Sequence, residues 1–158
     1  MHLSRYHRLA QLLRSETAVR EGIDNTPPPE LLPNLRRLAR GLDRVVDLLG
    51  YPLEISSGYR CPRLNGLVGG APDSQHVQGS AVDFTCEAFG AAPDVAAAIA
   101  GSAIRFDQCI LEFGRWVHLS FVARPRRRTL SIYTPGEYLE GLRRPDGSVL
   151  VTPVSGSG

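Results

Sequence analysis

The spacing of apolar residues predicts helices mainly in the first half of the chain. Leucines recur at helical spacing near residues 5 to 14, and the prolines of "IDNTPPPE" then interrupt the pattern. From residue 30 to 49 the apolar positions follow the i, i+3, i+4, i+7 pattern of one helix face, and Gly50 stands where a C-terminal cap is favoured. Residues 93 to 101 predict another helix, because a proline suits the first helical position and strong helix formers follow it.

Alternation of apolar and polar residues predicts strands later in the chain. "LEISS" and "SAVDF" alternate, and a loop with a short helix that stops at Gly69 and Gly70 separates them. "DQCILEF" and "WVHLSF" predict a hairpin around Gly114 and Arg115, and "LSIYT" adds a further strand. Helices first and mostly antiparallel strands later indicate an α+β fold, a mainly antiparallel sheet with N-terminal helices packed on it.

The chain length predicts one domain, since 158 residues can bury one core without further staples. We expect a single domain over 1–158. It would comprise an N-terminal helical extension with a proline-rich loop at 1–29, a core at 30–135 and a C-terminal helix or tail at 136–158.

Composition excludes several classes of protein. Hydrophobic residues make up 42% and charged residues 22% of the chain, as in ordinary globular proteins, and no apolar run is long enough to span a bilayer. The N-terminus lacks the apolar segment and cleavage site of a signal peptide, so we expect synthesis without one. Cys61, Cys86 and Cys109 show no C-x-x-C spacing, which disfavours disulfides or a thiolate zinc site.

The charge distribution gives little support for a charged partner. A net charge of +2 does not indicate a nucleic-acid partner, and we expect none. "ARPRRR", residues 123 to 128, is the only dense charge run, and a solvated loop is its ordinary interpretation. Attraction to anionic cell-wall polymers or lipid headgroups is the functional alternative. We expect a monomer.

The stretch "SQHVQGSAVDF" carries the first candidate chemistry. In a strand, Asp83 shares one face with Ala81, while Val82 and Phe84 take the opposite, core face. A buried carboxylate is costly unless it pairs with a charge or binds a metal. His76 can reach the same depression, because Gly79 lets the backbone turn between them.

His118 is the natural third metal ligand. It shares a strand face with Trp116 and Ser120, whereas His2 and His7 lie in an arginine-rich N-terminal segment where solvated side chains are expected. A catalytic zinc takes three protein ligands from imidazole and carboxylate and keeps one position for water. Two histidines and one carboxylate can also bind other divalent ions.

"SGYRCPRLNGLVGGAPDSQHVQGSAVDF" followed by "ILEFGRWVHLSF" resembles the zinc D-alanyl-D-alanine carboxypeptidase family of peptidoglycan peptidases, whose fold is shared with Hedgehog signalling domains. The pattern S-x-H-x-x-G-x-A-x-D, with upstream S-G-Y-R and downstream W-x-H, carries the resemblance over residues 30 to 122. The proline-rich "GIDNTPPPE" is similar to compact phage and prophage members. The resemblance implies that His76, Asp83 and His118 bind one Zn²⁺.

Glu112 is the candidate general base, the group that takes a proton from water and passes it to the leaving amine. A strict two-residue hairpin at Gly114 and Arg115 would put Glu112 on the face opposite His118, so we predict an odd loop or a bulge. The six-residue spacing resembles the Hedgehog-type branch, whereas many bacterial relatives carry a base or histidine where Arg115 or Trp116 stands here. Asp107 is the alternative base.

Arg60 and Ser74 are candidate substrate-binding residues. Arg60 precedes His76 by sixteen positions, matching the family's substrate-binding arginine, and a guanidinium can hold a carbonyl or carboxylate with two hydrogen bonds. Ser74 could bind the substrate carboxylate, although a serine in "PDSQ" is also an ordinary turn residue.

The resemblance implies a zinc peptidase that hydrolyses a bond of the peptidoglycan stem peptide, as a D,D-carboxypeptidase or an endopeptidase. We expect a phage or prophage lysis enzyme that acts at the cell wall or periplasm after release through phage-made pores, or as part of a virion. The alternative is a non-catalytic, zinc-stabilised binding or virion module of the same fold.

Overall fold

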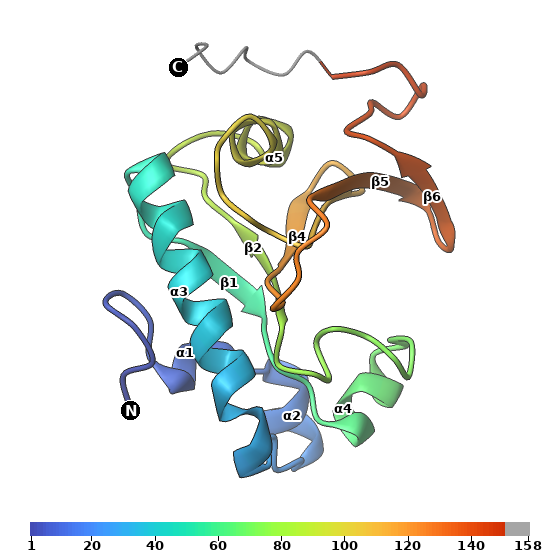
Figure 1. Cartoon of the computed structure of the whole chain (residues 1–158). Coiled ribbons are helices and arrows are strands. Elements are labelled where there is room, and N and C mark those ends of the chain that lie inside the picture. Colours follow the sequence, from blue (N-terminus) through green and yellow to red (C-terminus); the bar gives the residue numbers. More distant parts are fainter. Residues whose placement is uncertain (151–158) are drawn as a thin grey trace.

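The computed structural model describes residues 1–150, in which a six-stranded sheet is flanked by helices (Figure 1). In chain order the elements are α1 (Leu9–Leu13), α2 (Glu16–Glu21), the 3₁₀ turn η1 (Pro29–Leu31), α3 (Leu32–Leu49), β1 (Glu54–Ser57), α4 (Pro62–Leu67), β2 (Ala81–Thr85), α5 (Ala92–Ala100), β3 (Gln108–Glu112), β4 (Trp116–Ser120), β5 (Arg128–Thr134) and β6 (Glu137–Glu140).

The strand order in the sheet is β1-β2-β4-β3-β5-β6. Four neighbouring pairs are antiparallel, and only β3 and β5 run parallel. The predicted α+β fold with a mainly antiparallel sheet is therefore confirmed. The long connection from β2 through α5 to β3 lets β4 lie between β2 and β3, so that the hairpin is inserted at the centre of the sheet.

Helices α3 and α5 pack on one face of this sheet and form the main core with it. The predicted helix from 30 to 49 is confirmed as α3 and its preceding 3₁₀ turn, and Gly50 ends it in the left-handed conformation with φ 82°. Gly41 of α3 lies against Phe121, which directly follows β4, because a Cβ there would lie 2.5 Å from the ring of Phe121. Glycine at this position therefore leaves room for that ring against α3.

In the strands next to the predicted site, side chains alternate between the core face and the opposite face, as expected. Val82 and Phe84 of β2 and Val117 and Leu119 of β4 are fully buried in the core, with no exposed surface. Asp83 lies between the first pair and is aligned with His118 of β4 in the strand register. The two predicted ligands therefore occupy adjacent positions on the face opposite the helices.

The hairpin between β3 and β4 has an odd loop, as predicted. Glu112 pairs with Trp116, which leaves the three residues 113 to 115 in the turn. Phe113 and Gly114 both adopt positive φ, at 56° and 66°. Ile110 is the partner of His118, so Glu112, two residues further along β3, lies on the same sheet face as His118.

The C-terminal segment contains a strand where a helix or tail was expected. Within residues 136–150, Glu137–Glu140 form β6, paired with β5. Gly136 and Gly141 adopt positive φ, 79° and 80°, at the two ends of this strand, so the chain turns back onto β5 before a helix can begin. The predicted tail at 151–158 lies outside the described residues.

The expectation of a solvated His7 was wrong. His7 is only 3% exposed, and its Nδ1 lies 2.7 Å from Oδ1 of Asp43 on α3. The same carboxylate accepts hydrogen bonds from the Ser4 hydroxyl and from the backbone N–H groups of Arg5 and Tyr6. Asp43 thus holds the N-terminal loop on α3, a contact between positions too distant in sequence for local pattern to predict.

No helix within residues 1–150 has the length and hydropathy required to cross a membrane. All three cysteines are free.

Candidate metal centre

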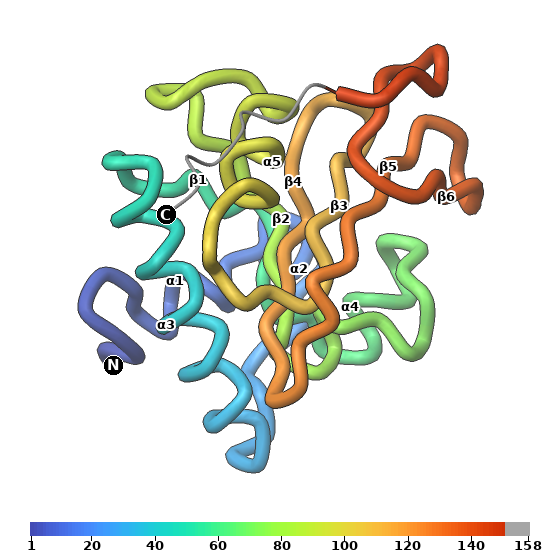
Figure 2. Tube along the Cα trace, turned by 45° about the horizontal axis from the view of Figure 1, so that its top comes forward, coloured from blue at the N-terminus to red at the C-terminus, as the bar shows by residue number. Residues whose placement is uncertain are grey.

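The face of the sheet opposite α3 opens into a cleft of about 810 Å³. Side chains of β2, β3 and β4 form its floor. The loop that follows α4 lines one side, and residues of β5, β6 and their turn line the other. Figures 1 and 2 place these two walls on the same side of the molecule, with α4 and its loop in green and β6 in red.

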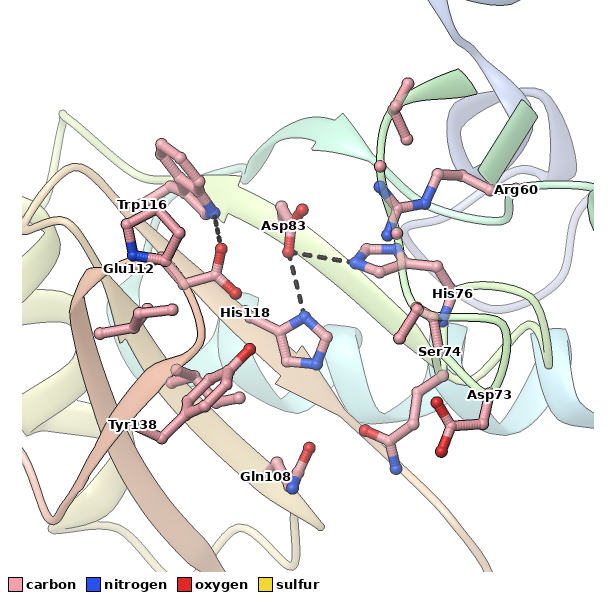
Figure 3. Close-up of a pocket in the computed structure, with 18 of the residues that line it drawn as sticks. Arg60, Asp73, Ser74, His76, Asp83, Gln108, Glu112, Trp116, His118 and Tyr138 are labelled. Carbon is pink, nitrogen blue, oxygen red and sulfur yellow. Dashed lines mark hydrogen bonds and ion pairs between the residues drawn. The ribbon is translucent and has the colours of Figure 1, made fainter. Parts of the chain in front are cut away.

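The structure brings His76, Asp83 and His118 together in this cleft (Figure 3). Their potential ligand atoms all lie within 4.8 Å of one another. Nε2 of His76 is 3.3 Å and Nδ1 of His118 is 3.1 Å from the same oxygen, Oδ1 of Asp83. Two imidazoles thus converge on one carboxylate from different elements, a loop and a strand.

The orientation of His76 is set by a backbone carbonyl. The Nδ1–H of His76 donates to the carbonyl oxygen of Gly58 at 2.8 Å, which leaves Nε2 as the nitrogen that faces Asp83. A Cβ at residue 58 would lie 2.3 Å from the carbonyl oxygen of Leu12. Glycine at position 58 therefore lets the backbone of Leu12, near the end of α1, approach closely, while the Gly58 carbonyl remains directed at His76.

The charge of Asp83 is stabilised within the site. Burial alone would raise the pKa of Asp83, but the hydrogen bonds from His118 and His76 outweigh it and hold that pKa well below its usual range. The carboxylate is therefore ionised at neutral pH and available as a ligand.

The donor set fits a zinc ion. Zinc prefers imidazole nitrogen and carboxylate oxygen, and bonds of about 2.0–2.1 Å in tetrahedral geometry separate neighbouring ligand atoms by about 3.3 Å. The separations of 3.3 and 3.1 Å at Asp83 match that value. Since all three ligand atoms lie within 4.8 Å of one another, the three residues could hold one metal ion.

Glu112 lies beside this triad with its carboxylate held by an indole. Nε1–H of Trp116 donates to Oε2 of Glu112 at 2.7 Å. Burial, followed by the negative charge of Asp83, raises the pKa of Glu112. A carboxyl group with a raised pKa is suited to accepting and releasing a proton near neutral pH.

Asp107, the alternative base, is already fully engaged. Its side chain is only 2% exposed and accepts hydrogen bonds from Nε and Nη2 of Arg126 at 2.9 and 2.8 Å, and from Nε2 of Gln75 at 2.8 Å. The bond from Arg126 is the main cause that lowers the pKa of Asp107. Because Asp107 does not line the cleft, the geometry favours Glu112 as the base.

Arg60 and Ser74 both line the cleft beside His76 (Figure 3). Nε of Arg60 is buried and has no hydrogen-bond partner within residues 1–150, and burial lowers the pKa of its guanidinium. Oγ of Ser74 accepts a hydrogen bond from the backbone N–H of His76 at 3.2 Å. Arg60 thus has unused hydrogen-bonding capacity at the site, and Ser74 stabilises the turn that carries His76.

Two groups that position the site residues were not predicted from the sequence, the Trp116 indole and the Gly58 carbonyl. Trp116 was noted only for sharing a strand face with His118, yet its indole fixes Glu112. The odd hairpin loop was the available signal, because it makes Trp116 the register partner of Glu112. The Gly58 carbonyl left no local signal, since its partner His76 lies eighteen positions away.

Comparison with protein-family models gives a match, described as Peptidase M15, over residues 5–120. No curated protein matches the chain. The matched residues run from the N-terminal segment to the end of β4 and include all four of His76, Asp83, Glu112 and His118. The match confirms the resemblance to zinc D-alanyl-D-alanine carboxypeptidases and agrees with a Hedgehog/DD-peptidase-like fold. With well over half of its length covered, the chain belongs to the Peptidase M15 family.

Proposed function

We propose that the protein is a zinc-dependent peptidase that hydrolyses a peptide bond in the stem peptide or cross-bridge of bacterial peptidoglycan. One observation carries the proposal: in a chain of the Peptidase M15 family, His76, Asp83 and His118 converge in the same cleft as Glu112, a half-buried glutamate with a raised pKa. A carboxylate of that kind is suited to proton transfer during peptide hydrolysis.

His76, Asp83 and His118 hold the zinc in this proposal. Two neutral imidazoles and one carboxylate would leave a net positive charge on the metal, and zinc held there would supply polarisation of a peptide carbonyl and a lowered pKa of bound water. The Gly58 carbonyl keeps His76 in the required tautomer.

Glu112 accepts the proton of the attacking water and delivers it to the leaving amine. The Trp116 indole holds one oxygen of the carboxylate, which leaves the other available to the cleft. Arg60 binds the scissile carbonyl or a carboxylate of the substrate, because its half-buried guanidinium is cationic and its Nε has no hydrogen-bond partner within residues 1–150. Ser74 adds a hydroxyl on the same side.

We further propose that the protein is a phage or prophage lysis enzyme or virion component that acts at the cell wall as a monomer. The proposed activity is that of a D,D-carboxypeptidase or of an endopeptidase. Mass spectrometry of digested peptidoglycan separates them, because the first releases free alanine and the second splits the stem peptide or cross-bridge.

The Glu112→Gln variant tests the catalytic proposal. The glutamine side-chain oxygen still accepts the Trp116 hydrogen bond but cannot take up a proton, so hydrolysis should fall about 10²- to 10⁴-fold. Zinc content and melting temperature should stay those of the wild type. Glu87→Gln, an exposed glutamate outside the cleft, is the matched control and should retain full activity.

Full hydrolysis by Glu112→Gln would remove Glu112 from the mechanism. Wild-type protein that binds zinc yet cleaves no bond of purified peptidoglycan would contradict the peptidase proposal and support the non-catalytic binding module.

A further inference from the structure

An apolar strip lies beside the metal centre on the same sheet face. Ile110, Leu130 and Ile132 are each at most 6% exposed and form a cluster of their own with Phe113, apart from the main core. The strand register places Ile110 next to His118, and Ile132 next to Glu112. Because Ile110 and Ile132 both line the cleft, this strip forms an apolar floor directly next to the ligands and the base.

Tyr138 stands at the outer edge of this floor. It is the register partner of Ile132, so the row Trp116, Glu112, Ile132, Tyr138 crosses four strands from β4 to β6. Tyr138 is 53% exposed yet lines the cleft, and Figure 3 shows its hydroxyl directed toward His118 and Glu112. No group within residues 1–150 is hydrogen-bonded to that hydroxyl, so it is free to bond a ligand.

Phe113 closes the end of the strip near the hairpin. It holds a positive φ of 56°, which is costly for a residue other than glycine, and its ring lies 5.6 Å from the Trp116 ring. The strained turn places an aromatic ring at the rim of the cleft. The apolar floor thus has an aromatic side chain at each end, Phe113 and Tyr138.

Part of the apolar strip, and Tyr138 beside it, lie outside the family match, which ends at residue 120. Ile132 and Tyr138 belong to β5 and β6, which follow that point in the chain. The metal ligands and the base are therefore supplied by the matched region, and the far wall of the cleft by a segment beyond it.

We propose that Ile110, Phe113, Ile132 and Tyr138 form a substrate subsite for an apolar side chain, such as the methyl group of an alanine, next to the scissile bond. Tyr138 covers this side chain with its ring and donates a hydrogen bond from its hydroxyl to the peptide backbone. The subsite rests on the proposed function, since it takes the ligand to be the peptidoglycan stem peptide.

The test compares Tyr138→Ala, Tyr138→Phe and the matched control Leu139→Ala. Leu139 lies next along β6, outside the cleft lining, and is 37% exposed, so its truncation probes strand stability alone. Kd is measured by calorimetry with muropeptides on zinc-loaded Glu112→Gln protein, in which turnover is blocked. KM and kcat are measured with the same muropeptides on protein that retains Glu112.

Loss of the ring and hydroxyl in Tyr138→Ala should raise Kd and KM about tenfold or more, with a smaller change in kcat. Loss of the hydroxyl alone in Tyr138→Phe should raise both about three- to tenfold. Leu139→Ala should not change Kd or KM. All variants should keep a melting temperature within a few degrees of that of the protein with Tyr138 and Leu139 intact.

Kd values for both Tyr138 variants within twofold of that of the Glu112→Gln protein with Tyr138 intact would overturn the subsite. An effect in Tyr138→Ala with none in Tyr138→Phe would overturn the hydrogen bond. If the protein with Glu112 hydrolyses nothing, the proposed function fails, and the Kd series still decides on the subsite because it requires no turnover.

Discussion

The two faces of the central strands show how one sheet serves both stability and chemistry. In β4, Val117 and Leu119 are buried among apolar neighbours under the helices, while His118 between them faces the carboxylate of Asp83 on the adjacent strand β2. Because side chains alternate along a strand, a register shift of one residue would expose the core and bury the ligands. The same register thus specifies both faces, but different side chains carry the two roles, so mutations should separate them.

The largest effect is expected from Asp83→Ala on the site face. Both imidazoles contact the same oxygen of Asp83, so its removal takes away the shared ligand. Zinc should fall from about one per chain to well below that, and peptidoglycan hydrolysis should fall about 10³-fold or more, because a bound metal contributes several kcal/mol of transition-state stabilisation. Elemental analysis and digestion assays on the same samples check this.

Asp94→Ala, an exposed carboxylate in the first turn of α5, is the matched control and should keep its metal. If Asp83→Ala kept the zinc content of the wild type, the zinc would be bound at a site that does not require Asp83.

Truncating a side chain to alanine on the opposite, core face of β4 should lower stability and leave zinc binding unchanged. Leu119 is fully buried next to His118, and Leu119→Ala should lower the free energy of unfolding by about 2–5 kcal/mol through lost burial and a residual cavity. At temperatures where the variant is folded, its zinc content should equal that of the wild type. Urea unfolding and elemental analysis provide both readouts, and a folded variant without zinc would break the proposed separation of the two faces.

The smallest effect concerns how the loop carrying His76 is attached to the sheet. Asp107 binds Gln75 of this loop and Arg126, and Arg126 holds the pKa of Asp107 below its usual range. A carboxyl with a lowered folded-state pKa stabilises the fold above its unfolded pKa of about 4, and this contribution is lost as pH falls through the folded-state value. Asp107→Asn should therefore cost about 1 kcal/mol at pH 7 and progressively less below pH 4.

Urea unfolding of metal-free protein at several pH values measures the free energy of unfolding of the wild type and of Asp107→Asn. If the difference between the two stayed constant from pH 7 to pH 3, the ionised carboxylate would not be the stabilising group.

Much of the site could be predicted because its parts are local. Alternation along "SAVDF" and "WVHLSF" placed Asp83 and His118 on one face, and parity alone required the odd loop that the register of Glu112 with Trp116 confirms. The choice between Glu112 and Asp107 could not be made from spacing. It depends on which carboxylate Arg126 and Gln75 occupy, and these partners come from other segments.

The errors have the same origin. His7 was expected to be solvated, but Asp43, thirty-six positions later, buries it against α3. A helix or tail was expected from residue 136 on, but Glu137–Glu140 form β6, because β5 offers a strand partner that local composition does not show.

The sequence by itself determined the α+β class, the strand faces and the set of metal-ligand candidates, since each follows from periodicity and residue chemistry within short segments. The tertiary structure alone decided that the Gly58 carbonyl orients His76, that Asp107 is occupied and that Tyr138 reaches the cleft. These contacts join positions distant in the chain, and the packing of loops and strands in the tertiary structure, not any local pattern, brings them together.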